Sequence, residues 1–230
     1  MRWSTIERDL RIQHGPLIAG VDEVGRGPLA GPVVACAVVM PPERRAMPGV
    51  NDSKQLTAKK REKLVLKIRD NALGIGIGAA SVREIDRLNI LQASILAMRR
   101  ALRRLPVTPN HVLIDGRALR TLEVQHTAVV HGDARCYSIA CASIVAKITR
   151  DRVMHALSPR YPQYRWENNV GYSTANHLRG IAEHGITPHH RRSFLPCSQL
   201  SLDLATDAEV VIDAAQLSAL IDSATEDLTH

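Results

Sequence analysis

The chain has 230 residues, a length that suits one domain or one domain with a short tail. Hydrophobic residues make up 45% of the sequence but aromatic residues only 3%, so the core must be aliphatic. So few aromatic side chains argue against a protein that binds single strands by stacking their bases. The formal net charge is +7, and it is divided unevenly along the chain.

Residues 201–230 contain seven acids and no Lys or Arg, which leaves a charge of about +14 on the first 200 residues. A body this basic indicates a polyanionic partner such as nucleic acid; a basic protein without such a partner is the alternative. We expect one domain over residues 1–200, including a C-terminal helical part, followed by an acidic tail at 201–230 that is helical or flexible.

Two features concern the compartment. The chain does not open with a secretory segment, and its longest apolar run, residues 33–40, is too short to span a membrane. The four cysteines form no C-x-x-C pair, so we expect reduced thiols and a cytoplasmic protein. We also expect a monomer with no membrane partner. The His189–Arg192 run is interpreted as a solvated basic patch rather than a metal site.

The first half of the chain alternates strands and helices. Residues 1–16 are interpreted as a short polar lead. Apolar, β-branched runs predict strands at about 17–22 and 33–40, and their short link predicts an antiparallel pair. A basic helix is expected over 57–70 and a glycine-containing strand over 72–82. One long helix should follow, opened by a capping box of Ser81 and Glu84 and ending near Arg104.

The second half adds two strands and more helices. Buried strands are expected over 111–115 and 124–130, and a long small-residue helix over 136–157. Ser173 or Thr174 can cap a last helix that ends at Gly185. Residues beyond 201 have the apolar spacing of an acidic amphipathic helix. The order predicts an α/β fold, a five-stranded mixed sheet flanked by helices, with extra C-terminal helices.

Four acids stand where strands end or helices begin: Asp22, Glu23, Asp115 and Asp133. Carboxylates are seldom buried without a cationic partner, and strands of one sheet can bring their ends together. Carboxylate oxygens suit Mg²⁺ and Mn²⁺, and phosphodiester hydrolysis suits two such ions about 4 Å apart. Asp115 before Gly116 alone would favour a simple turn. The recurrence at four positions favours a metal site.

The glycines after the first strand invite a second interpretation. Gly25, Gly27 and Gly31 loosely resemble a dinucleotide-binding loop, but prolines and a second strand follow instead of a helix. We interpret the segment as a loop that exposes backbone N–H groups and Arg26 to an anion, with glycine permitting close approach.

The run Asp22-Glu-Val-Gly-Arg-Gly-Pro-Leu-Ala-Gly-Pro-Val-Val34 resembles the opening signature of bacterial ribonuclease HII. Three further elements are similar to that family: Asp52-Ser53-Lys54, the helical segment Ser138–Asp151, and Gly171-Tyr-Ser-Thr-Ala-Asn-His177. The resemblance covers roughly residues 17–195. It implies a ribonuclease H-like fold, and the acidic tail is not part of it.

The resemblance also implies an activity. Such an enzyme hydrolyses the RNA strand of RNA–DNA hybrids and cleaves 5′ of single ribonucleotides embedded in duplex DNA, leaving 3′-hydroxyl and 5′-phosphate ends. It would use two Mn²⁺ or Mg²⁺ ions, and its partners would be hybrid duplexes and ribonucleotide-containing DNA. The implied catalytic and metal-binding residues are Asp22, Glu23, Asp115 and Asp133. The implied substrate-binding residues are Gly25, Arg26, Gly27, Lys54, Lys147 and Tyr172.

Alternatives accompany these assignments. The lysines can be ordinary solvated side chains, and Tyr172 can be a core residue. A non-catalytic nucleic-acid-binding protein could use the same basic surface, but strand-end acids would repel phosphate. Another nuclease or recombinase of this fold would lack the Gly-Arg-Gly and Gly-Tyr elements. Ribonuclease HIII carries an additional N-terminal domain, for which we expect no room in sixteen residues.

Overall fold

The computed structural model describes residues 2–200 together with Ala219 and Asp222. The chain forms two compact units. Unit 1 comprises the chain up to Val24, residues 34–78 and residues 95–148; unit 2 comprises residues 25–33, residues 79–94 and the described residues from Thr149 onward. The predicted acidic tail and its helix lie outside the described residues, apart from Ala219 and Asp222, so the boundary at 201 stays a prediction.

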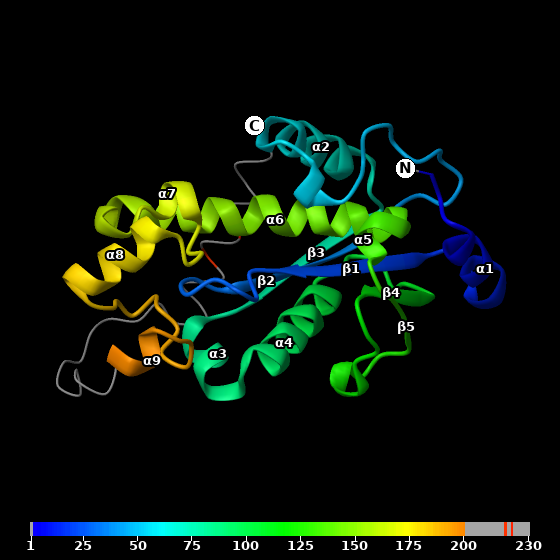
Figure 1. Ribbon diagram of the computed structural model, residues 1–230. Coiled ribbons are helices and arrows are strands. Elements are labelled where there is room, and N and C mark those ends of the chain that lie inside the picture. The colour runs from blue at the N-terminus through cyan, green and yellow to red at the C-terminus, as the bar shows by residue number, and fades with distance from the viewer. Residues whose placement is uncertain (1, 201–218, 220–221, 223–230) are drawn as a thin grey trace. The chain divides into compact units, whose positions relative to one another are not determined.

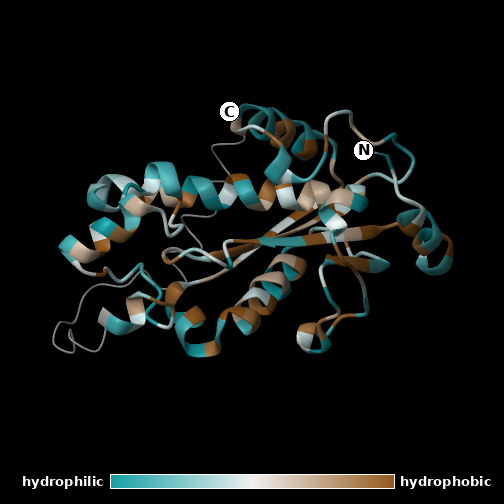
Figure 2. Cartoon of the chain, viewed as in Figure 1, coloured by the Kyte–Doolittle hydropathy of each residue, from teal (hydrophilic) through white to brown (hydrophobic). Residues whose placement is uncertain are grey.

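A five-stranded mixed sheet forms the framework, as predicted (Figure 1). Its order is β3–β2–β1–β4–β5, where β1 pairs antiparallel with β2 and parallel with β4, and β4 pairs parallel with β5. The strands are β1 (Ile18–Val24), β2 (Val33–Val39), β3 (Gly74–Ala80), β4 (His111–Asp115) and β5 (His126–Val129). Figure 2 shows the strands mostly in the hydrophobic colours, in keeping with an aliphatic core.

Helices flank the sheet and make up most of the C-terminal part. The α-helices are α1 (Thr5–His14), α2 (Ala58–Asn71), α3 (Val82–Leu88), α4 (Ile90–Arg103), α5 (Gly132–Arg135), α6 (Tyr137–Leu157), α7 (Trp166–Asn169), α8 (Ala175–His184) and α9 (Cys197–Leu200). Short 3-10 turns are η1 (Ser53–Gln55), η2 (Arg120–Leu122), η3 (Ser158–Arg160) and η4 (Pro162–Tyr164). The predicted helix 57–70 and the predicted α8, capped by Thr174, are confirmed.

Glycines in the strands let the helices approach the sheet of unit 1 closely. A Cβ at Gly20 would lie 2.2 Å from the carbonyl carbon of Ser138, at the start of α6. A Cβ at Gly78 would lie 2.3 Å from the carbonyl oxygen of Ala97 in α4. The two helices lie on opposite faces of the sheet (Figure 1). These glycines are therefore needed for packing, in agreement with the prediction for the third strand.

The interpretation of residues 1–16 as a polar lead was wrong, because this segment contains α1. Ser4 and Glu7 form a capping box at its start. Glu7 is buried, and its carboxylate also accepts hydrogen bonds from the main-chain N–H groups of Tyr137 at 3.1 Å and Ser138 at 2.8 Å. One acid thus caps α1 and α6 together, a partnership that local sequence cannot reveal.

The single helix expected up to Arg104 was also wrong, because Asn89 divides it into α3 and α4. Its φ is +72°, a conformation that Asn adopts more easily than most residues. Its side-chain oxygen then accepts a hydrogen bond from the N–H of Gln92 at 3.1 Å. The capping box of Ser81 and Glu84 is confirmed at the start of α3.

An aliphatic cluster joins α1 to the sheet and to α6. It consists of Leu10, Ile18, Leu113, Val129, Cys136 and Ile139. All four cysteines are buried and free, as predicted for reduced thiols. Among the described residues, no helix has the length and apolar character needed to cross a membrane.

Candidate active site

The sheet register brings Asp22 and Asp115 to the same level. Val21 on β1 pairs with Ile114 on the parallel β4, so the next residue of each strand is an acid. Asp115 ends β4, whereas β1 continues past Asp22 to Val24. The N–H of Gly132 donates to Asp115 Oδ1 at 2.6 Å, which fixes the start of α5 against β4. The residue after Gly132 is Asp133. Three acids from β1, β4 and α5 therefore lie in the same region of unit 1.

The pKa values of two of these acids reflect that proximity. Asp22 is 6% exposed, and its pKa lies well above its usual range because of burial first, then the charges of Glu23 and Asp115. The pKa of Asp133 is raised by burial, by Asp115 and by Asp52. Mutual repulsion and burial together mean that positive charge would stabilise this group of carboxylates.

Lys54 supplies part of that charge from η1. Its Nζ lies 3.6 Å from Asp133 Oδ2. Burial lowers the pKa of Lys54, but Asp133, Asp52, Asp22 and Asp115 outweigh it and raise the pKa overall. The same ammonium group therefore feels three of the four predicted catalytic acids, and the structure brings Asp22, Asp115, Asp133 and Lys54 together.

The donor set fits a hard divalent ion, although its oxygens are not gathered into a chelate. In the described part of the chain, no three Asp, Glu, His or Cys side chains are close enough to hold a metal ion. Asp22 accepts the Glu23 N–H at 2.8 Å, and Asp115 and Asp133 have the partners given above. Carboxylate oxygens that repel one another are the ligands that Mg²⁺ or Mn²⁺ would draw together.

Glu23 is placed differently from the other acids. The predicted end of the first strand at Asp22 was wrong, because β1 runs regularly through Asp22 and Glu23 as far as Val24. Side chains of successive strand residues leave opposite faces, so Asp22 and Glu23 do not start from the same side. Its role as a ligand stays a prediction.

Two buried serines lie between the segment of Lys54 and Asp22, and their role was not predicted. The hydroxyl oxygens of Ser53 and Ser143 lie 2.8 Å apart, and both residues are buried. Ser143 also hydrogen-bonds to the Asp22 carboxylate. Ser53 belongs to the Asp-Ser-Lys element and Ser143 to the matched helical segment, so the resemblance contained the signal. Lys147, four residues further along α6, is half-buried in unit 1.

The predicted substrate loop lies in unit 2. Gly25 is buried, whereas Arg26 and Gly27 are exposed. Gly25 has a φ of +90° and would place a Cβ 2.1 Å from Arg150 Nε, so the fold requires glycine there. Gly27 differs, because its Cβ would meet only the Tyr172 ring, 4.0 Å away. The fold does not explain Gly27, which leaves space for a ligand beside Tyr172.

Tyr172 is not a core residue, because 41% of it is exposed. Its carbonyl oxygen lies 2.8 Å from His177 Nδ1, and His177 Nε2 lies 3.1 Å from His190 Nε2. Since the Thr187 N–H donates to His190 Nδ1, the hydrogen-bond pattern places a proton on His190 Nε2 and another on His177 Nδ1. A chain of neutral histidines thus supports the main chain at Tyr172.

The interpretation of His189–Arg192 as a solvated patch was wrong for three of its residues. His189, His190 and Arg191 are buried, and only Arg192 is exposed. Burial, followed by neighbouring charges, lowers the pKa of His189 to about 4 and that of His190 to about 3. Trp166 and Tyr164 pack against His190, so the segment is an aromatic core in unit 2.

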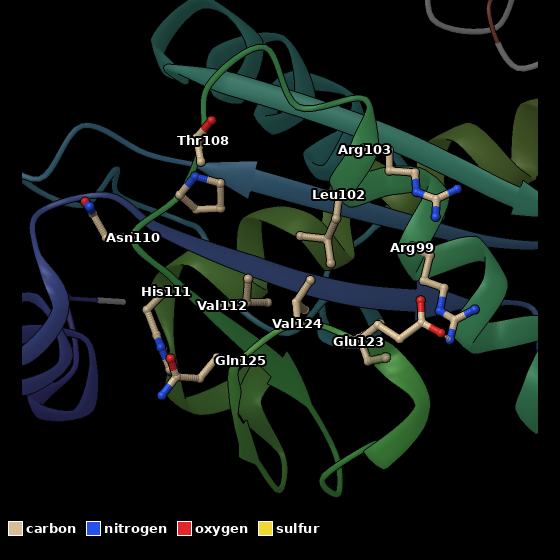
Figure 3. A pocket seen from close by; sticks show the side chains of 12 residues that line it. Arg99, Leu102, Arg103, Thr108, Asn110, His111, Val112, Glu123, Val124 and Gln125 are labelled. Carbon is tan, nitrogen blue, oxygen red and sulfur yellow. Dashed lines mark hydrogen bonds and ion pairs between the residues drawn. The ribbon is translucent and has the colours of Figure 1, made fainter.

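A cavity of about 410 Å³ lies elsewhere in unit 1 (Figure 3). Arg99, Arg103, His111 and Val124 are among its lining residues. His111 begins β4 and Asp115 ends it, so the cavity lies toward the end of the strand opposite the acids. Arg99 Nη2 forms an ion pair with Glu123 Oε1 at 2.5 Å. The cavity is separate from the candidate site.

A five-stranded mixed sheet in this strand order, flanked by helices, places the protein in the ribonuclease H-like fold class. Among solved structures, the chain is similar to the ribonuclease H2 of Pyrococcus horikoshii, with a TM-score of 0.67 and 26% identity over 83% of this chain and 100% of that one. It also shares its fold with Bst-RNase HIII, solved in complex with Mn²⁺, with a TM-score of 0.63 and 20% identity over 85% of this chain and 72% of that one.

The family model described as Ribonuclease HII matches residues 19–197. The Ribonuclease HII of Thermosynechococcus vestitus is 56% identical over 180 residues, 77% of this chain and 83% of that protein. That of Granulibacter bethesdensis is 51% identical over 209 residues, 88% of this chain and 93% of that protein. The chain belongs to the ribonuclease HII family, and is an enzyme of the type 2 ribonuclease H kind that cleaves the RNA strand of RNA–DNA hybrids.

Proposed function

We propose that the enzyme nicks duplex DNA on the 5′ side of a single embedded ribonucleotide, leaving 3′-hydroxyl and 5′-phosphate ends, and that it acts as a cytoplasmic monomer. The observation that supports its chemistry is that Asp22, Asp115 and Asp133 all raise the pKa of Lys54, whose Nζ lies 3.6 Å from Asp133 Oδ2. Acids that repel phosphate have no use in a protein that only binds nucleic acid, so this grouping favours hydrolysis.

Asp22, Asp115 and Asp133, with Glu23, would hold two Mn²⁺ or Mg²⁺ ions. When bound, such ions supply an activated water and stabilise the leaving oxygen of a phosphodiester. The protein residues have their own tasks. Lys54 neutralises Asp133 before substrate arrives, and Ser143 holds the Asp22 carboxylate in place. Lys54 and Lys147 would then contact backbone phosphates.

Recognition of the ribonucleotide is assigned to Gly25, Arg26, Gly27 and Tyr172. Only the 2′-hydroxyl distinguishes ribose from deoxyribose at a given site. The open space at Gly27, bordered by the ring of Tyr172, supports close approach of a sugar–phosphate backbone. Because Gly25 follows Glu23 by two residues in the chain, recognition and chemistry share one short segment.

The test uses three matched duplexes: one with a single ribonucleotide, one with an all-RNA strand, and one of DNA alone. We expect cleavage of the first two with Mn²⁺ or Mg²⁺, none with chelator, and none of plain DNA. End-labelling should place the nick 5′ of the ribonucleotide. Cleavage of the all-RNA strand alone would refute the single-ribonucleotide activity, and binding without any cleavage would support a non-catalytic protein.

A further inference from the structure

Two buried arginines in unit 2 hold one loop, residues 25–32, by its carbonyl oxygens. Arg191 donates from Nη2 to Gly25 O at 2.5 Å, from Nη1 to Arg26 O at 2.8 Å, and from Nε to Gly31 O at 3.1 Å. Arg150 donates to Pro32 O at 3.0 Å and to Ala30 O at 3.1 Å. Both guanidinium groups are buried completely. The carbonyl oxygens of the loop are therefore bound by two positively charged guanidinium groups.

Glycines allow this close contact. Gly31 has a φ of +82° and Gly171 a φ of +87°, both in the region that favours glycine. A Cβ at Gly171 would lie 2.5 Å from Ala30 O. The N–H of Leu29 donates to the Gly171 carbonyl at 2.8 Å. The loop, its two arginines and the Gly171 segment thus fit together as one block within unit 2.

The orientation of the carbonyl groups fixes the orientation of the N–H groups. In a trans peptide the C=O and N–H bonds point in opposite directions. Because Gly25 O and Arg26 O face the Arg191 guanidinium, the N–H groups of Arg26 and Gly27 point away from it. Arg26 and Gly27 are the exposed residues of this part of the loop. Two successive N–H groups facing outward form a site suited to an anionic oxygen.

The positive charges of Arg191 and Arg150 also favour an anionic oxygen at these N–H groups. Carbonyl dipoles stabilise a buried guanidinium without cancelling its formal charge. Burial, followed by neighbouring charges, lowers the pKa of Arg191 to about 9 and that of Arg150 to about 10, so both remain protonated at neutral pH. An oxygen in front of the N–H pair would feel this positive charge.

We propose that Arg191, supported by Arg150, is a positioning residue that aims the N–H groups of Arg26 and Gly27 at the sugar–phosphate oxygens of the ribonucleotide. The inference rests on the proposed function and deepens it. Arg191 does not touch substrate. It sets the orientation of the loop that does, and so determines discrimination between ribose and deoxyribose.

The first experiment compares Arg191→Lys with the matched control Arg192→Lys, since Arg192 is the exposed neighbour. Lysine keeps the charge but cannot reach three carbonyl oxygens at once. For Arg191→Lys we expect the KM for the single-ribonucleotide duplex to rise about tenfold or more, with a smaller change on the all-RNA hybrid and no change in Mn²⁺ affinity. Arg192→Lys should match the wild type.

Two results would overturn the inference. One is unchanged KM in a folded Arg191→Lys protein. The other is an equal fall in kcat on every substrate with unchanged KM, which is what a smaller folded fraction produces. Failure of the proposed function is distinct, because the wild type itself would then not cleave the single-ribonucleotide duplex.

A second experiment needs no variant. The amide resonances of Arg26 and Gly27 in the wild-type protein are followed by NMR as the single-ribonucleotide duplex is added without divalent ions. We expect both to shift, while Gly185, whose N–H donates to Ile181 O, stays unchanged. If the resonances of Arg26 and Gly27 do not move with bound duplex, the inference is wrong, even where Arg191→Lys fails to fold.

Discussion

The acidic cluster of unit 1 and the loop at residues 25–32 in unit 2 differ in how their buried charges are compensated. The pKa values of Asp22 and Asp133 are raised by burial and by neighbouring carboxylates, and Lys54, which pairs with Asp133, is largely exposed. Arg150 and Arg191 have carbonyl oxygens around them before any ligand arrives. The first region is electrostatically incomplete without a cation, whereas the second is already organised.

This difference indicates a division of labour. A cluster of repelling acids costs stability and is useful where ions bind. A preorganised loop loses little entropy when substrate binds and can discriminate by geometry. Substitutions in the two regions should therefore have different consequences: loss of chemistry with no loss of stability in unit 1, and loss of discrimination in unit 2.

The largest effect is expected from Asp115→Asn. Cleavage of a hybrid duplex should fall by more than about 100-fold, because a neutral amide is a poor ligand for a hard divalent ion. Without metal, duplex binding and the melting temperature should equal or exceed those of the wild type, since repulsion with Asp22 and Asp133 is removed. The measurements are initial rates, fluorescence anisotropy and thermal melts. A destabilised variant would argue that Asp115 is structural.

The next largest effect is expected from Gly27→Ala. Its Cβ meets no fold atom closer than 4.0 Å, so the melting temperature should stay within about 2 °C of the wild type. Cleavage at a single ribonucleotide should fall about tenfold, because the methyl group fills the space reserved for substrate. Gly171→Ala is the contrasting variant: its positive φ and Ala30 O contact should reduce stability by about 1–3 kcal/mol. Unchanged kinetics for Gly27→Ala would remove the loop from the substrate site.

Tyr172→Ala tests the ring beside that space. Cleavage at a single ribonucleotide should fall several-fold more than cleavage of an all-RNA hybrid, where many equivalent positions are available. Tyr172→Phe should retain most of the activity if stacking matters, and should resemble Tyr172→Ala if the hydroxyl matters. Equal loss on every substrate together with a lower melting temperature would favour a structural tyrosine.

Much of the fold follows from local sequence. The strands and α2 were predicted within a few residues because apolar periodicity and caps are local signals, and Ser81 and Glu84 correctly marked the start of α3. Glu7 was missed because its main partners, Tyr137 and Ser138, lie about 130 residues away. Asn89 was missed because a polar residue on a helical pattern gives no sign that its φ is positive.

The residues of the candidate site could be predicted from the sequence, but the contacts between them could not. Asp22, Asp115 and Asp133 lie near enough for their charges to act on Lys54, but in the described part of the chain no three acids are close enough to hold a metal ion, so their shared role stays a prediction. A basic run is usually exposed, so the sequence predicts that Arg191 and His190 face solvent. Only the tertiary structure shows that carbonyl oxygens and aromatic rings enclose them. The Ser53–Ser143 contact joins two motifs that the resemblance had matched, but no local rule predicts that two serines 90 residues apart touch.

The smallest effect concerns pH and unit 2. His190 and His189 have folded pKa values of about 3 and about 4, against 6.5 for the ordinary side chain. The unfolded chain therefore binds more protons than the folded chain between about pH 4 and pH 6.5. Their stabilising contribution is complete above pH 6.5 and is lost as the pH falls.

Urea unfolding at pH 7.5, 6.0 and 5.0 measures this loss. The buried acids of unit 1 act in the opposite direction, so the informative quantity is the difference between variants. His190→Gln should flatten the fall in the free energy of unfolding, and His184→Gln, at an exposed position, should leave it unchanged. Identical pH profiles for the two variants would mean that His190 is not held neutral.

The account depends most on the acidic end of the sheet binding divalent ions. Titration of Mn²⁺ into the wild-type protein and into Asp22→Asn, followed by the electron paramagnetic resonance signal of free Mn²⁺, tests this directly and needs no substrate. We expect saturable uptake by the wild type and uptake weakened at least tenfold in Asp22→Asn. Equal uptake by both proteins, with both folded, would contradict it.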